Sequence, residues 1–154
     1  RRRHSFPTRR SSDLSYIVRD RNWGTYNPEI SNLEIDQGEA GFRVSYDAVC
    51  RDDAQAFTYR AVITADARGN LEFTADGEAQ SDFTTNRTGF VVLHPVDGVS
   101  GAAVEVLHVD GTVERSRFPE LIDPTCPFKD IRALTHEVLP GASHSGHVQL
   151  PNSA

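Results

Sequence analysis

Short stretches in which apolar and polar residues alternate recur along most of the chain. Side chains of a β-strand point to opposite faces in turn, so a period of two predicts half-buried strands. β-Branched and aromatic residues are frequent in the same stretches, which favours strands over helices. The predicted strands are Ser15–Arg19, Asn32–Gln37, Phe42–Cys50, Phe57–Asp66, Asn70–Ala75, Asp82–Thr85, Gly89–His94, Val104–Val109, Thr112–Phe118 and Ile131–Val138.

Turn-forming residues separate the predicted strands, among them Asp76-Gly77 and Asp97-Gly98. The clearest hairpin lies over Val104–Phe118, because Asp110-Gly111 is the dipeptide preferred in a two-residue type I′ turn. Ile131–Val138 has some helical spacing, but its β-branched residues favour a strand. About ten short strands without intervening helices predict an all-β protein, an antiparallel β-sandwich truncated at its C-terminal end.

Composition and charge limit the classes of partner. The 154 residues are the size of one domain, and no apolar run approaches the roughly 20 residues of a membrane-spanning helix. A net charge of -6 argues against nucleic acid, whose binding depends on Lys and Arg contacts to phosphates. We therefore expect a soluble protein that binds neither nucleic acid nor a membrane.

The two cysteines, Cys50 and Cys126, are far apart in the sequence and have no neighbouring metal ligands at zinc-site spacing. We expect both to be free thiols in a reducing compartment, with no metal and no cofactor. No secretory signal precedes the first strand, so cytoplasm is the expected location.

Both ends of the chain differ from its body. Residues 1–14 read RRRHSFPTRRSSDL, which resembles a translated sequencing adapter; a basic tail that binds nucleic acid is the alternative. The chain contains no Met, even at position 1, and after Gly141 the alternation stops. We predict a fragment with an artefactual or disordered tail at 1–14, a β domain at 15–141 and a disordered or frame-shifted tail at 142–154. His144 and His147 are then surface residues of that tail.

Arg87 and His94 are the candidate substrate-binding residues. Both lie in the run NRTGFVVLHP, where the planar fork of the Arg87 guanidinium suits a carboxylate or sugar hydroxyls. The alternative is structural: an ion pair for Arg87 and a backbone hydrogen bond for His94. No catalytic residue is predicted, because no nucleophile motif is present and the acid and imidazole residues do not converge in the pattern. These acid and imidazole residues are Glu105, His108, Asp110, His136 and Glu137.

Four ordered runs carry a resemblance to a known family: NRTGFVVLHP (86–95), VEVLHVDG (104–111), FPELIDP (118–124) and PFKDIRALTHEVLPG (127–141). Together they resemble the N-terminal part of D-apionate lactonases, which open the lactone of a branched sugar acid. The resemblance implies an N-terminal β domain ahead of a barrel-like central domain and a C-terminal β domain. It places the catalytic residues in the central domain, which this chain lacks.

Three functions are open at this point. The first is a non-catalytic N-terminal β domain that docks on the central domain of a sugar-acid lactonase and lends Arg87 or His94 to the rim of its site. The second is a stand-alone carbohydrate-binding module, which needs exposed aromatic residues although the chain has a single Trp. The third is a mutarotase-like β-sandwich that uses His94 or His136 with a carboxylate.

Overall fold

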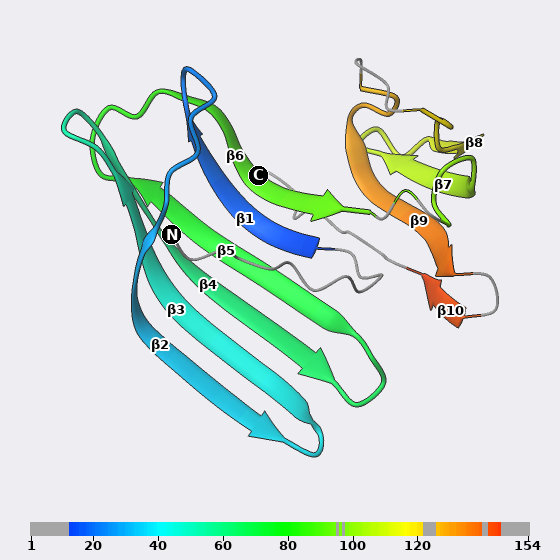
Figure 1. Ribbon diagram of the computed structural model, residues 1–154, viewed down its shortest axis with the longest axis horizontal. Coiled ribbons are helices and arrows are strands. Elements are labelled where there is room, and N and C mark those ends of the chain that lie inside the picture. The colour runs from blue at the N-terminus through cyan, green and yellow to red at the C-terminus, as the bar shows by residue number, and fades with distance from the viewer. Residues whose placement is uncertain (1–12, 95, 97, 122–125, 140–141, 146–154) are drawn as a thin grey trace, which may run out of the picture. The chain divides into compact units, whose positions relative to one another are not determined.

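The computed structural model describes residues 13–94, 96, 98–121, 126–139 and 142–145 (Figure 1). These residues divide into two compact units: the first unit is Leu14–Val92, and the second unit holds Asp13 and the described residues from Leu93 onward. The strands are β1 (Asp13–Asp20), β2 (Glu29–Gly38), β3 (Gly41–Arg51), β4 (Ala56–Asp66), β5 (Leu71–Ala79), β6 (Thr85–Leu93), β7 (Ala103–His108), β8 (Val113–Arg117), β9 (Ile131–Leu139) and β10 (Ala142–Ser145). The predicted all-β class is confirmed. No helix in the described part of the chain is long and apolar enough to cross a membrane.

The first unit is built on a four-stranded antiparallel sheet in the order β2-β3-β4-β5. Its register puts apolar residues opposite one another on one face, as in the row Val44, Ile63 and Phe73. We call this the inner face. The other face carries exposed ion pairs, such as Arg60 with Asp47 at 2.8 Å. The alternation predicted from the sequence is therefore the pattern of one sheet with a buried and a solvated side.

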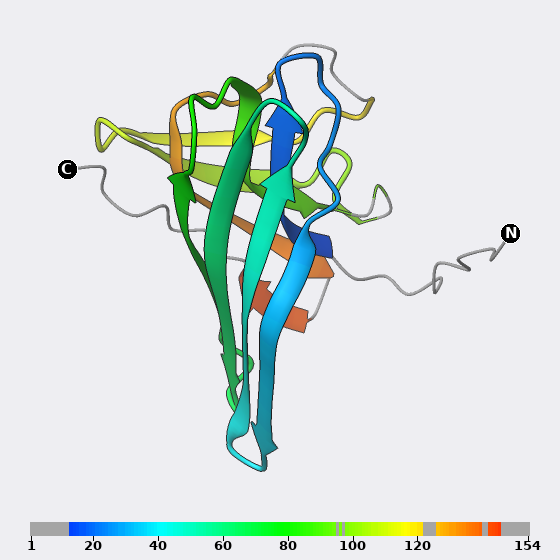
Figure 2. The same cartoon turned by 90° about the vertical axis from the view of Figure 1, so that its left-hand side faces the viewer.

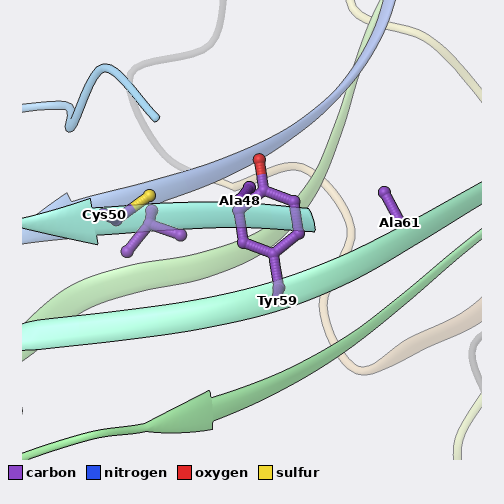
Figure 3. Close-up of a cluster of buried hydrophobic side chains, with 5 residues drawn as sticks. Ala48, Cys50, Tyr59 and Ala61 are labelled. Atoms are coloured by element: carbon purple, nitrogen blue, oxygen red, sulfur yellow. The ribbon is translucent and has the colours of Figure 1, made fainter. Parts of the chain in front are cut away.

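A two-stranded sheet, β1-β6, packs against part of the inner face. The buried core between the two sheets comes from β1, β3 and β4 and consists of Val18, Ala48, Cys50, Tyr59 and Ala61 (Figure 3). Aromatic rings extend this core, since Tyr16 of β1 lies 4.7 Å from Tyr59, centroid to centroid. Phe90 of β6 lies 4.9 Å from Phe73 of β5. The first unit is thus a small two-layer sandwich.

The strands β1 and β6 cover only part of the inner face. The β2–β3 and β4–β5 hairpins extend past β1 and β6 (Figures 1 and 2). At these hairpin ends Ile35, Phe42 and Leu71 point to the inner side and are 66%, 37% and 53% exposed. We call these three residues the open apolar face.

The second unit contains the antiparallel sheet β10-β9-β7-β8. Its buried residues come from β7, β9 and the segment before β7: Val99, Val104, Val106, Ala133 and His136. Ile131–Val138 is a strand, β9, as the sequence favours.

The predicted hairpin over Val104–Phe118 is confirmed, but its turn differs from the predicted type. Leu107 pairs with Val113, and the His108 amide donates to the Thr112 carbonyl at 2.9 Å, so three residues form the loop. Only Gly111 of this loop has positive φ, at 87°, whereas a type I′ turn needs positive φ at both central residues. Asp110 accepts hydrogen bonds from the Thr112 amide and hydroxyl, which stabilises this longer loop.

Two local predictions are wrong. Asp82–Thr85 is not a strand before Thr85, because the side chain of Gln55 takes the place of a strand partner: it accepts from the Thr84 amide at 2.9 Å and donates to the Thr84 carbonyl at 3.1 Å. Asp76-Gly77 is not a turn. Gly77 lies inside β5 opposite Tyr59, where an added Cβ would meet the Phe57 ring at 2.4 Å. The glycine serves close packing rather than chain reversal.

The β structure extends further at both ends than the predicted domain of residues 15–141. β1 begins at Asp13, inside the segment expected to be an artefactual tail, and β10 covers Ala142–Ser145, where no strand was expected. The rest of both tails, including His147, lies outside the described residues, so the division into 1–14, 15–141 and 142–154 stays a prediction.

Candidate functional site

Arg87 lies on β6 of the first unit, where it is exposed and its guanidinium stands over an indole ring. The Arg87 Cζ atom is 5.0 Å from the ring centroid of Trp23, within the range of a cation–π contact. A second guanidinium, that of half-buried Arg19, is 5.6 Å from the same centroid. Trp23 is the single Trp of the chain and is 51% exposed.

The tight turn after β1 positions Trp23. Asp20 directs this turn, because its Oδ1 atom accepts from the backbone amides of Asn22 at 2.7 Å and Gly24 at 2.8 Å. The chain then returns beside β1, with the Tyr26 amide donating to the Val18 carbonyl at 3.0 Å. Trp23 has a φ of 71°, which is uncommon for a bulky residue and costs backbone strain.

The two arginines of this cluster differ from Arg51 and Arg60 of the neighbouring sheet. Arg51 and Arg60 bind the carboxylates of Glu29 and Asp47. Within the described part of the chain, neither Arg19 nor Arg87 has a carboxylate within ion-pairing distance, and Arg19 Nε is buried without a hydrogen-bond partner. Two positive charges thus share one exposed aromatic ring in a protein whose net charge is -6.

His94 follows β6 and belongs to the second unit, where it contacts His136 of β9. Their ring centroids are 4.6 Å apart and the planes are nearly perpendicular, at 87°. Phe118 completes the cluster, with its ring 5.1 Å from His136 and 6.1 Å from His94. Burial, with a smaller contribution from His136, lowers the pKa of His94 below its usual value.

His136 is 4% exposed and lines a pocket of about 540 Å³ in the second unit. Glu105 and Arg115 also line this pocket, and Arg115 Nε donates to Glu105 Oε2 at 2.9 Å across the β7–β8 pair. Glu105 is opposite Thr135, the neighbour of His136, so alternation sends this ion pair and the imidazole to opposite faces of the sheet.

The candidates named from the sequence separate between the two units. Arg87 belongs to the first unit and His94 to the second, and their substrate-binding role stays a prediction. His108 has a structural role: Nδ1 lies 2.8 Å from the Lys129 carbonyl and Nε2 lies 3.2 Å from Glu114. Among the described residues, no three His, Cys, Asp or Glu side chains gather closely enough to hold a metal ion.

Sequence reasoning missed Arg19 and Trp23 as functional candidates. The available signal was a lone Trp in a polar turn that follows an Arg at a strand end. It did not indicate Arg87 as the partner, because β1 and β6 become neighbours only through sheet pairing. It also could not indicate the positive φ of Trp23, which the Asp20 turn imposes.

Comparisons with known proteins give one family. The family model described as "D-apionate lactonase, N-terminal domain" matches residues 10–149. The curated D-apionate lactonase of Brucella anthropi is 50% identical over 131 residues, which make up 84% of this chain and 22% of that protein. The chain therefore spans less than a quarter of the length of this relative. No solved structure matches.

Proposed function

We propose that this chain, which belongs to the family of D-apionate lactonase N-terminal domains, is the non-catalytic accessory domain of an enzyme that hydrolyses D-apionolactone to D-apionate. The observation that carries the proposal is the family match over 10–149 together with 50% identity to the Brucella anthropi lactonase. Because the matched segment is 22% of that protein, most of the relative's chain lies outside the similarity. The accessory domain acts with that remaining part.

The open apolar face supports a docking role. Ile35, Phe42 and Leu71 are exposed apolar side chains on the same side of a sheet whose opposite side is charged. An apolar patch with a polar surround is typical of an interaction surface. We assign the catalytic remainder of the lactonase as the partner that covers this face. The matched segment is only 22% of the relative, so the rest of that chain is available to pack against it.

A chimera tests the accessory role. Residues 15–139 of this chain replace the matching segment of the Brucella anthropi lactonase, and hydrolysis of D-apionolactone is compared with that relative lacking the segment. We expect turnover from the chimera and background hydrolysis from the 154-residue chain alone. Lactone hydrolysis needs an activated nucleophile and an oxyanion stabiliser held in register, which the remainder supplies.

Adjacent residues on opposite sides of β5 test the docking face in the same chimera. Leu71→Lys places a charge on the open apolar face, and Glu72→Lys places it on the solvated face. We expect Leu71→Lys to lower turnover at least tenfold and Glu72→Lys to leave it unchanged. Equal effects of the two substitutions would contradict the assignment of this face.

One outcome would favour the mutarotase-like alternative. If the 154-residue chain alone hydrolysed the lactone, and His94→Ala or His136→Ala abolished that turnover, the domain would be a self-contained enzyme. The contact between these two histidines is the specific observation that keeps this alternative open.

A cytoplasmic location belongs to the same proposal. Cys50 and Cys126 are both free, which suits a reducing compartment. Fractionation of cells that produce the tagged protein tests it, and recovery from the periplasmic fraction would contradict it.

A further inference from the structure

We infer that Arg19, Trp23 and Arg87 form a binding site for a small carboxylate anion on the first unit. The guanidinium carbons of Arg19 and Arg87 lie 5.6 Å and 5.0 Å from the ring centroid of Trp23, which lies in the turn after β1. We call these residues the arginine–tryptophan site. The assignment of a carboxylate rather than a phosphate rests on the proposed function, whose product is a sugar acid.

Charge is the first argument for an anion. Both guanidinium groups are positive, and no acidic side chain of the described residues forms an ion pair with either one. The nearby carboxylate of Asp20 accepts two backbone amides through its Oδ1 atom, which commits it to the turn. An incoming carboxylate supplies the missing negative charge and accepts the paired N–H donors that a guanidinium presents.

Preorganisation is the second argument. Strained backbone persists where the surrounding structure enforces it, and such residues cluster at ligand sites. Trp23 has positive φ, which the Asp20 turn enforces, and its ring remains half-exposed. Both arginines come from strands: Arg19 from β1, where its carbonyl accepts from the Thr85 hydroxyl, and Arg87 from the paired strand β6. The two positive groups are therefore held in place before a ligand arrives.

The charge of the chain limits the class of ligand. The guanidinium groups stand over Trp23, so the indole orients the two arginines. A nucleic acid would need a longer basic surface, whereas the chain is acidic overall. The site thus fits a small anion that the exposed guanidinium of Arg87 receives beside Trp23.

The single Trp makes the site directly measurable. Trp23 fluorescence of the 154-residue chain is titrated with sodium D-gluconate at constant ionic strength, and isothermal calorimetry repeats the titration. Sorbitol, the matching neutral polyol, serves as the ligand control, and inorganic phosphate as the competing anion. We expect a saturable change with gluconate and none with sorbitol.

Substitutions decide whether the arginines are responsible. Arg87→Gln should weaken gluconate binding about tenfold or more, since it removes a charge-assisted, two-point contact. Arg87→Lys keeps the charge but loses the fork, so it should also weaken binding. Arg68→Gln is the matched control, because Arg68 is a highly exposed arginine at the β4–β5 turn of the same unit.

Three results would overturn the inference: no saturable change with gluconate, equal affinity in Arg87→Gln, or binding of phosphate without binding of gluconate. The chimera tests the proposed function separately. Chimera turnover without gluconate binding rejects the arginine–tryptophan site and keeps the accessory role. Gluconate binding together with an inactive chimera keeps the site and rejects the accessory role.

Discussion

The imidazole rings of His94 and His136 meet edge to face, with centroids 4.6 Å apart, inside the second unit. Phe118 is the other ring packed against both. Protonation of one ring would place a charge in a partly buried site beside a second histidine. This is why burial and His136 lower the pKa of His94.

The lowered pKa predicts a pH-dependent stability of the second unit. The unfolded chain binds a proton at His94 near the usual pH of about 6.5, whereas the folded unit binds it only at lower pH. The unfolding free energy of the second unit should therefore be highest above about pH 6.5. It should fall as the pH drops below that value, until His94 is protonated in the folded unit as well. Hydrogen exchange of β7 and β9 amides between pH 5 and 8 measures this. In His94→Gln the loss of amide protection between pH 8 and pH 5 should be smaller than in the unsubstituted chain. An unchanged loss of protection would contradict the assignment of this pH dependence to His94.

Two glycines of one turn should respond differently to the same substitution. Gly41 has a φ of 142°, and a Cβ added there would lie 1.9 Å from the Ala65 carbonyl oxygen, whereas one added at Gly38 meets nothing within 4 Å. We expect Gly41→Ala to lower the unfolding free energy by about 1–3 kcal/mol. Gly38→Ala should change it by less than about 0.5 kcal/mol. Denaturant unfolding followed by Trp23 fluorescence measures both, and similar values would disprove the predicted contrast.

The β7–β8 turn depends on the backbone of Gly111. Its φ of 87° disfavours β-branched residues, although a Cβ there meets nothing within 4 Å. Gly111→Val should therefore destabilise the hairpin by about 1–2 kcal/mol through backbone strain alone. Gly111→Asn is the matched control, because Asn tolerates positive φ. Hydrogen exchange of β7 and β8 amides should show the loss for Val and a smaller one for Asn; the reverse order would rule out the strain explanation.

A hydroxyl joins two turns of the first unit. The Tyr26 hydroxyl donates to Asp52 Oδ2 at 2.6 Å and accepts from Gln55 Nε2 at 2.8 Å. Tyr26→Phe removes both bonds, so the unfolding free energy should fall by about 1–2 kcal/mol. Tyr16→Phe is the comparison, since Tyr16 contacts its neighbours mainly through its ring. Fluorescence-detected unfolding measures both variants, and an equal loss in the two would show that the Asp52 and Gln55 hydrogen bonds are not the cause.

The local pattern was sufficient for strands and for the position of one turn. Alternation reports which residues face a core, so β3 and β4 could be predicted within one or two residues of their ends. Asp110-Gly111 marked the chain reversal because glycine accepts positive φ at little cost. The number of residues in that loop depends on the pairing of Leu107 with Val113, which lies outside the dipeptide.

The sequence by itself determined the all-β class, the apolar and polar sides of the strands, and the resemblance to lactonase N-terminal domains. Only the tertiary structure decided which side chains meet. Pairing of β1 with β6 brought Arg87 to Trp23, and packing around β9 brought His94 to His136. The physical reason is that alternation is local to each strand, whereas strand order and packing depend on contacts between residues far apart in the chain.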